Sequence, residues 1–202
     1  MPHDPSDESS PAPMATRRSF TTALSGTALA ALAGCIGTRQ SESVPDPIDL
    51  GGEKTDDQGG MVIGLHAGPN GQIFYRDNAP KGHGNPAWFH TLSMGLFPYY
   101  FEHERMGWTA EVVYVTDYST VDYELTEEDG RLSISTHTAA ETFGDATMMT
   151  YVVDSEVLGG MGAELIPFSD TADAEAFASE HEGDTVEFDD VTPEWLDGYM
   201  RS

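Results

Sequence analysis

The sequence of 202 residues contains a single cysteine, Cys35, and very few basic side chains. One cysteine excludes a disulfide within the chain and any zinc or iron–sulfur site made of several cysteines. Only nine Lys and Arg residues stand against 35 Asp and Glu residues, so the formal net charge is −26. Because like charges repel, nucleic acid and a bare anionic membrane surface are not expected as partners.

The excess of acid is typical of a protein that works in concentrated salt. A net charge of this size repels itself and destabilises a compact fold in dilute salt. In molar salt the Debye length falls to about 3 Å, and the same surface is tolerated. The acidic residues are spread along the chain rather than clustered, which favours a halophilic protein over a local cation-binding surface. Hydrophobic residues make up 39% of the sequence, enough for a packed core.

Arg17 and Arg18 precede an uncharged stretch that runs from Ser19 to Thr38. Paired arginines before an apolar stretch are typical of a secretory signal, and the Ser-Phe that follows them resembles a twin-arginine signal. Residues 1–13 are polar and rich in proline, which predicts disorder. The first 35 residues are therefore expected to be a disordered start followed by a signal, with translation beginning at Met1 or at Met14.

The apolar stretch leads into Leu32-Ala33-Gly34-Cys35, which resembles a lipobox. We expect the thiol of Cys35 to carry a lipid that holds the protein at the extracytoplasmic face of the cell membrane. The alternatives are a chance cysteine or an uncleaved transmembrane anchor, which would be short and polar for a hydrocarbon core of about 30 Å. Residues 36–58 are rich in Ser, Pro, Gly and acidic side chains, and predict a flexible tether.

Residues 59–118 predict a unit in the order strand, strand, helix, strand. Met61–His66 and Gln72–Tyr75 are apolar and flank a turn that ends in Asn-Gly. Asn85 and Pro86 have the residue types of a helix N-cap and first position, before apolar residues at helical spacing. Glu111–Val115 is the third strand of this unit.

Residues 148–190 predict the same order again. The segments are the strand Met148–Asp154, the strand Glu164–Phe168, a helix capped by Asp170 or Thr171, and the strand Thr185–Phe188. The fold class is therefore expected to be α+β, with two related ββαβ units whose small antiparallel or mixed sheets carry helices on one face. Residues 119–147 are expected to be a linker with a helix over 136–143, and residues 191–202 a C-terminal tail.

The sequence carries no hydrolase elbow, phosphate-binding loop or dinucleotide fingerprint. Its seven histidines are scattered, and no acid–base pair can be singled out among 35 carboxylates. We therefore do not expect an enzyme.

Two methionines are the residues most suggestive of chemistry. Met61 follows Gly59-Gly60, and Met161 follows Gly159-Gly160, so each is expected at a turn beside a strand. A thioether is a soft, uncharged ligand that suits Cu(I). The alternative is that methionine fills the core, and this is how we interpret Met94, Met148 and Met149.

Three histidines lie near the first of these turns: His66 ends the first strand, and His83 and His90 follow the second. Imidazole also suits copper. For each histidine taken alone, a solvated surface position is the simpler interpretation.

The run Met161-Gly162-Ala163-Glu164-Leu165-Ile166-Pro167-Phe168 resembles the NosL family. The resemblance extends to further segments, namely Gly60-Met61-Val62-Ile63, Gln72-Ile73-Phe74-Tyr75, Pro86-Ala87-Trp88-Phe89, Tyr114-Val115-Thr116-Asp117-Tyr118, and Ala174-Glu175-Ala176-Phe177 with His181. It implies a pair of related ββαβ units and a copper-binding lipoprotein that helps to assemble the copper centre of nitrous oxide reductase.

The chain departs from the family at one position of consequence. The family places Cys-Gly-Met where this chain has Gly59-Gly60-Met61, and that thiolate is a principal Cu(I) ligand in the resemblance. Met61 and Met161 match ligand positions, and His66 or His83 is the candidate to replace the thiolate.

Two functions follow as expectations. The first is a membrane-anchored Cu(I) metallochaperone linked to denitrification, with nitrous oxide reductase or another copper acceptor protein as its partner. The second is a paralogue that has lost the metal and acts as a surface binding or scaffold lipoprotein, which the missing cysteine favours.

Overall fold

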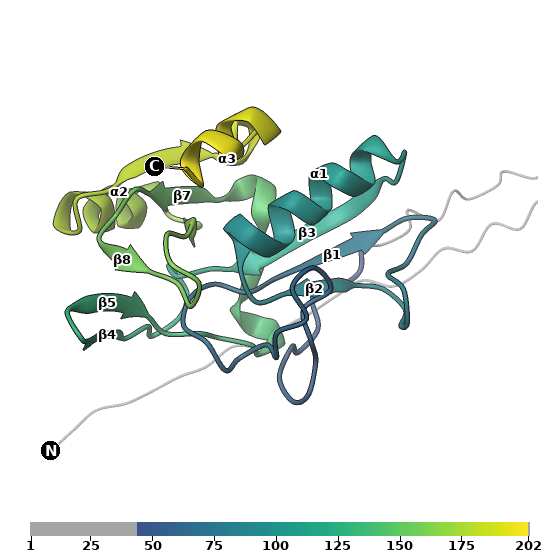
Figure 1. Cartoon of the computed structure of the whole chain (residues 1–202), viewed down its shortest axis with the longest axis horizontal. Coiled ribbons are helices and arrows are strands. Elements are labelled where there is room, and N and C mark those ends of the chain that lie inside the picture. The colour runs from purple at the N-terminus through teal and green to yellow at the C-terminus, as the bar shows by residue number, and fades with distance from the viewer. Residues whose placement is uncertain (1–43, 202) are drawn as a thin grey trace, which may run out of the picture. The chain divides into compact units, whose positions relative to one another are not determined.

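The computed structural model describes residues 44–201 (Figure 1). This part of the chain is a mixed α+β fold of three small sheets and three α-helices. The predicted fold class is confirmed. Cys35, Arg17 and Arg18 lie outside the described residues.

The first sheet has the strand order β2-β1-β3-β6, and its neighbours are antiparallel. The strands are β1 (Gly71–Tyr75), β2 (Ala87–Phe89), β3 (Ala110–Thr116) and β6 (Phe143–Asp145). Every residue of β1 is buried, as expected for a central strand that is covered on both faces. The strands predicted over 72–75 and 111–115 are both present.

The second sheet repeats the order of the first three strands. It runs β10-β7-β9, all antiparallel, with β7 (Thr150–Val153), β9 (Ile166–Phe168) and β10 (Asp184–Glu187). In each half the first strand is central, the second lies at one side, and the strand after the helix lies at the other. The two halves therefore share one ββαβ topology, with the short strand β8 (Val157–Leu158) inserted into the second.

Helices cover these sheets. A π-helical segment, η1 (Leu92–Leu96), leads directly into α1 (Phe97–Arg105), which lies along β1 and β3 (Figure 1). In the second half, α2 (Thr171–Glu180) begins where Asp170 accepts a hydrogen bond from the amide of Ala172, as the capping prediction required. The third helix, α3 (Pro193–Tyr199), is capped by Thr192.

Strand β7 separates two hydrophobic cores. Tyr151 and Val153 face the larger core, which contains Phe97 of α1 and Leu196 of α3. Val152, one residue out of phase, faces the smaller core around α2. Because strand side chains alternate between faces, this fully buried four-residue strand contributes side chains to both cores.

The segment predicted as a linker, 119–147, contains regular structure. It holds the hairpin of β4 (Leu125–Glu128) and β5 (Arg131–Ile134), and β5 pairs in parallel with β8 to form a third sheet. The helix predicted over 136–143 is wrong: only the 3₁₀ turn Ala140–Thr142 occurs there, before β6. Two further 3₁₀ turns lie at Ala146–Met148 and Phe188–Asp190, and α3 occupies the predicted tail.

Two other local predictions are wrong. Met61–His66 is not a strand, since Gly64 has a positive φ and the only pairing there is a single bridge from Val62 to Thr55. Asn85 does not cap a helix, because its side chain bonds the backbone of Tyr75. The residues after it form β2, because they pair with the edge of β1 through backbone hydrogen bonds that a helix could not make.

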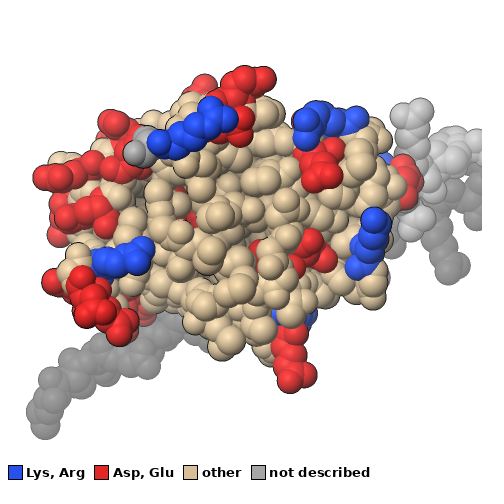
Figure 2. Space-filling view, in the orientation of Figure 1, with Lys and Arg blue, Asp and Glu red and all other residues tan. Residues whose placement is uncertain are grey.

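Figure 2 shows one face of the molecule. Acidic side chains gather along one edge of this face, where α2 and the tip of the β4–β5 hairpin lie, and the centre of the face is largely uncharged.

None of the helices within residues 44–201 has the length and apolar character that a membrane span requires.

Candidate metal centre

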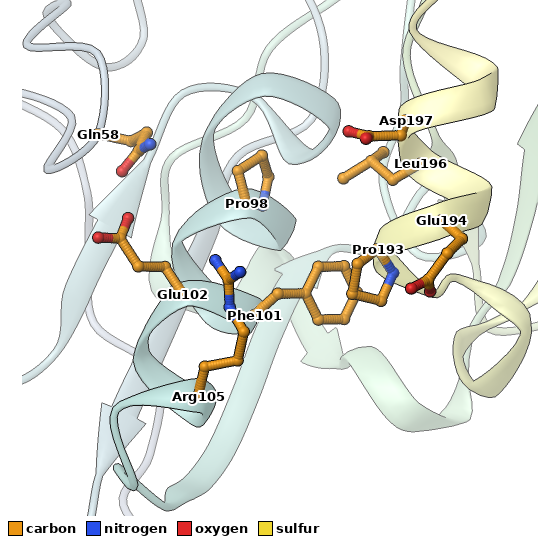
Figure 3. Close-up of a pocket in the computed structure, with 9 residues that line it drawn as sticks. All are labelled: Gln58, Pro98, Phe101, Glu102, Arg105, Pro193, Glu194, Leu196 and Asp197. Atoms are coloured by element: carbon orange, nitrogen blue, oxygen red, sulfur yellow. The ribbon is translucent and has the colours of Figure 1, made fainter.

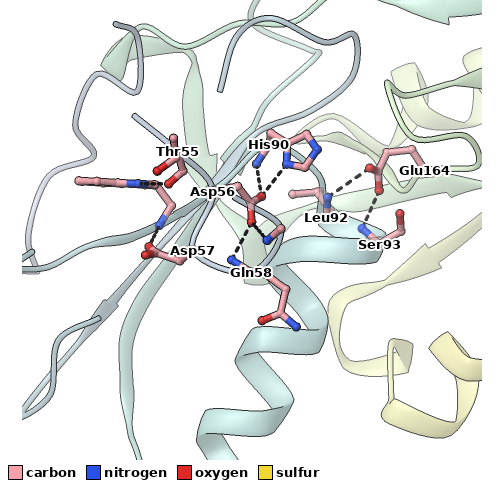
Figure 4. A network of polar contacts seen from close by, with 10 residues as sticks. Thr55, Asp56, Asp57, Gln58, His90, Leu92, Ser93 and Glu164 are labelled. Carbon is pink, nitrogen blue, oxygen red and sulfur yellow. Dashed lines mark hydrogen bonds and ion pairs between the residues drawn. The ribbon is translucent and has the colours of Figure 1, made fainter. Parts of the chain in front are cut away.

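A loop before the first sheet is folded around the carboxylate of Asp56. One oxygen, Oδ1, accepts hydrogen bonds from the amides of Gln58 at 2.7 Å and Gly59 at 2.6 Å (Figure 4). The other, Oδ2, accepts from the amide of His90 at 2.8 Å and lies 2.7 Å from His90 Nδ1. The loop closes where the amide of Asp56 donates to the carbonyl of Met61 at 2.8 Å. The Asp56 carboxylate therefore fixes both the loop that carries Met61 and the ring of His90.

The carboxyl group of Asp56 is held in its charged form. Burial alone would raise its pKa, but the hydrogen bonds from the His90 side chain and from the amides of Gly59, His90 and Gln58 lower the pKa below 3.8. Because an ionised carboxylate can only accept, the proton in this pair lies on His90 Nδ1. In the neutral imidazole, the Nε2 atom of His90 then carries the free lone pair.

The Nε2 atom of His90 is buried and has no hydrogen-bond partner among residues 44–201. The residue is 5% exposed, so the simpler interpretation of His90 as a surface histidine is wrong. Buried polar atoms in folded proteins are nearly always paired, and each exception calls for an explanation.

His66 lies beside the ring of His90, on a separate segment. The ring centres of His66 and His90 are 6.0 Å apart. His66 also lines an open cavity of about 350 Å³, together with Leu65 and the glycines Gly159 and Gly160. The planes of the His66 and His90 rings are inclined by 60°, and His66 is reachable from solvent through that cavity.

The turn that carries Met161 packs directly on the His66 segment. The amide of Gly160 donates to the carbonyl of Ala67 at 2.7 Å. A Cβ at Gly160 would lie only 2.5 Å from the Cβ of His66, so only glycine fits this contact. The turn itself closes through the amide of Gly159 and the carbonyl of Gly162, and it leaves Met161 48% exposed.

Glu164 connects this turn to η1. Its carboxylate accepts from the amides of Ser93 at 2.7 Å, Leu165 at 3.0 Å and Leu92 at 3.2 Å (Figure 4). Leu92 and Ser93 begin the π-helix two residues after His90, where free amides favour an anion. Burial raises the pKa of Glu164 to about 7, although these amide bonds favour its charged form.

The family model for NosL matches residues 47–196. The chain belongs to the NosL family. Among solved structures, its fold is similar to the crystal structure of the copper chaperone NosL from Shewanella denitrificans. That similarity has a TM-score of 0.56 at 24% sequence identity, and it covers 72% of this chain and 94% of that chain. No curated protein sequence matches the chain.

Three of the four ligands predicted for this NosL-family protein lie on segments that meet. The Met161 turn touches the His66 segment, and the loop of Met61 encloses Asp56, which holds the His90 ring beside His66. Whether these residues bind a metal stays a prediction. No group of three or more His, Cys, Asp or Glu side chains that could hold a metal ion occurs within residues 44–201.

The fourth candidate, His83, has both ring nitrogens engaged. Its Nδ1 lies 2.7 Å from the carbonyl of Gly84, and its Nε2 lies 3.0 Å from Asp57 Oδ1. The ring also stacks on Trp88 with centres 3.8 Å apart. A metal bond from His83 would have to replace one of these contacts.

The other methionines are placed differently from the prediction. Met149 is buried in the larger core as expected. Met94 and Met148 are exposed, by 45% and 73%, so their assignment to the core is wrong. Met94 lies on the solvent side of η1. The sequence predicted a core position because Met94 stands within an apolar run.

A cavity of about 350 Å³ between α1 and α3 is separate from these donors (Figure 3). Its lining combines Phe101 and Leu196 with charged groups such as Arg105 and Glu194. These are not the soft or imidazole donors that copper favours, so we do not assign the metal to it.

The sequence analysis did not identify two residues of this arrangement, Asp56 and Glu164. Asp56 and His90 are 34 positions apart, and no spacing rule connects them. For Glu164 a signal was available, because a lone carboxylate stands between a turn and a buried strand in an otherwise apolar run.

We expect Gly68→Ala to destabilise the protein by about 1–3 kcal/mol more than Gly82→Ala. Both glycines have a positive φ near 100°, so the backbone strain is matched. A Cβ at Gly68 would lie 2.8 Å from the Cα of Gly159, whereas a Cβ at Gly82 meets nothing within 4 Å. Denaturant unfolding of the two variants measures the difference. Equal losses of stability would mean that the two segments are not in close contact.

Proposed function

We propose that this protein is a copper chaperone that binds Cu(I) through Met61, Met161 and His66 and passes it to an acceptor protein. The observation that carries the proposal is the contact between the Met161 turn and the His66 segment, with 2.7 Å between the Gly160 amide and the Ala67 carbonyl. It brings together two segments nearly a hundred residues apart, one carrying a thioether and the other an imidazole. Membership of the NosL family and the likeness to a copper chaperone support the same function.

The arrangement suits transfer rather than storage. Met161 is about half exposed and stands at the tip of a turn, so an acceptor can approach its sulfur. Thioether and imidazole are neutral donors that exchange without the loss of a charged ligand. We further propose that a lipid on Cys35 anchors the protein at the extracytoplasmic face of the cell membrane, and that the acceptor is nitrous oxide reductase or another copper protein.

The test is an anaerobic Cu(I) titration of the full chain in molar salt against a competing chelator. We expect stoichiometric binding by the wild type and binding weaker by about 10–100-fold or more in the Met61→Leu/Met161→Leu variant. Met106→Leu/Met200→Leu is the matched control, since it removes two exposed thioethers from the ends of α1 and α3. A wild type that cannot compete for Cu(I) would overturn the proposal and favour a scaffold lipoprotein without metal.

A further inference from the structure

The unpaired Nε2 atom of His90 needs a partner. Leaving a buried acceptor unsatisfied is costly, because the atom has lost its hydrogen bonds to water and gained none in the protein. No protein donor lies within reach of this atom among the described residues, although the ring itself is fixed on its other side. The fold thus fixes the imidazole of His90 and leaves the lone pair of Nε2 available to a ligand from outside the protein.

The pairing with Asp56 prepares Nε2 to bind a metal. Both carboxylate oxygens of Asp56 already accept hydrogen bonds, from Gln58 and Gly59 on Oδ1 and from His90 on Oδ2. The carboxylate therefore acts only as an acceptor, and His90 Nδ1 carries the proton. A carboxylate or carbonyl on the far nitrogen is what orients nearly every histidine that binds a metal, since it fixes both the tautomer and the ring.

The distance to His66 fits a shared ion. With metal–nitrogen bonds of about 2.0 Å, two imidazoles on one ion have ring centres roughly 5 to 6.5 Å apart, depending on the angle between the bonds. The observed separation is 6.0 Å, with 60° between the ring planes. The separation of the two rings is thus within the range that one shared ion requires.

A side chain at position 59 would also lie next to the His90 ring. A Cβ built at Gly59 would lie 3.6 Å from His90 Cε1, the ring carbon between Nδ1 and Nε2. Position 59 is the one at which the family resemblance places a cysteine. A cysteine side chain at position 59 would thus begin beside the edge of the His90 ring.

We infer that His90 Nε2 is a copper ligand of this protein, in the place left by the missing thiolate, with Asp56 as its positioning residue. This inference rests on the proposed function. The site is then made of the imidazoles of His90 and His66 together with thioether sulfur, and contains no thiolate. Such a donor set suits Cu(I), and by its softness also Ag(I), which does not change oxidation state in air.

The test uses Ag(I) as the probe and His90→Asn as the variant. An asparagine amide keeps a donor for Asp56 where Nδ1 was and has no atom in the place of Nε2. His83→Asn is the matched control, because His83 also pairs with a neighbouring aspartate, through Nε2 at 3.0 Å. We expect His90→Asn to bind Ag(I) at least about 10-fold more weakly and His83→Asn to bind like the wild type.

A second readout does not depend on how the variants fold. In the wild type, ¹⁵N spectra of the imidazoles should show the His90 Nε2 resonance shifting as Ag(I) is added, and the His83 resonances unchanged. Wild-type binding with an unshifted His90 Nε2 and an unaffected His90→Asn variant would overturn the inference and leave the proposed function standing. Failure of the wild type to bind either Ag(I) or Cu(I) would overturn the proposed function itself.

Discussion

Replacing Gly59 by cysteine is expected to raise the affinity for Cu(I) by about 10–100-fold or more. At metal sites, the loss of a residue that only hydrogen-bonds a ligand already lowers metal affinity by about 10–100-fold, and a direct ligand should count for at least as much. The position has room for the side chain. The nearest atoms to a Cβ there are His90 Cε1 at 3.6 Å and Asp56 Oδ1 at 3.7 Å, both ordinary contacts, and the backbone φ is not in the left-handed region. The thiolate would add a soft, charged donor beside two imidazoles.

Gly59→Ser is the control for this substitution, because serine has nearly the same shape and no soft donor. Both variants should be made with Cys35→Ser, so that residue 59 carries the only thiol in the chain. Chelator competition gives the affinities, and the near-ultraviolet absorption of a Cu(I)–thiolate bond reports directly on the new ligand. Equal affinities for the cysteine and serine variants would place residue 59 outside the copper site.

The elements that could be predicted from the sequence are those whose pattern is decided locally. The strands β1 and β3 are short apolar runs bounded by turn residues, and helix α2 starts at a clear capping residue, Asp170. The order strand, strand, helix, strand in both halves follows from these elements, and the NosL resemblance pointed to the same topology.

The elements that could not be predicted depend on contacts between distant segments. Met61–His66 is apolar enough for a buried strand, yet Ile63 is buried while Leu65 is 73% exposed, because Gly60 and Gly64 turn the chain. Trp88 and Phe89 continue the helical spacing of the apolar residues after them, but pairing with β1 places both in a strand. A local pattern cannot weigh a sheet edge that is supplied by another part of the chain.

The candidate site divides in the same way. The repeated Gly-Gly-Met pattern pointed to Met61 and Met161 as candidates, since each was expected at a turn where a thioether can face a partner. His90 and Asp56 form their pair only because η1 and the loop before β1 come together in the fold. A histidine among seven, and an aspartate among 35 acidic residues, carry no sequence signal of such a pairing.

Glu164 should make the stability of the protein fall as the pH rises from about 4.5 to about 7. Burial raises its pKa from 4.5 to about 7, so over this window the folded state keeps a proton that the unfolded state has lost. Stability falls with pH wherever the folded state binds more protons, and it levels off once both states are ionised above about 7. For a fully buried group, a shift of this size corresponds to about 3 kcal/mol.

Glu164→Gln isolates this contribution. The amide oxygen of glutamine can still accept from Ser93 and Leu165, which share Oε1 of Glu164, and the side chain cannot ionise. We therefore expect the variant to gain about 3 kcal/mol relative to the wild type between pH 5 and pH 8, measured by denaturant unfolding at constant molar salt. Other groups do not confuse the comparison: Asp56 titrates below this window, and burial lowers the pKa of His137 equally in both proteins. Parallel pH profiles would show that Glu164 is ionised in the fold, and that its amide bonds to the start of η1 outweigh its burial.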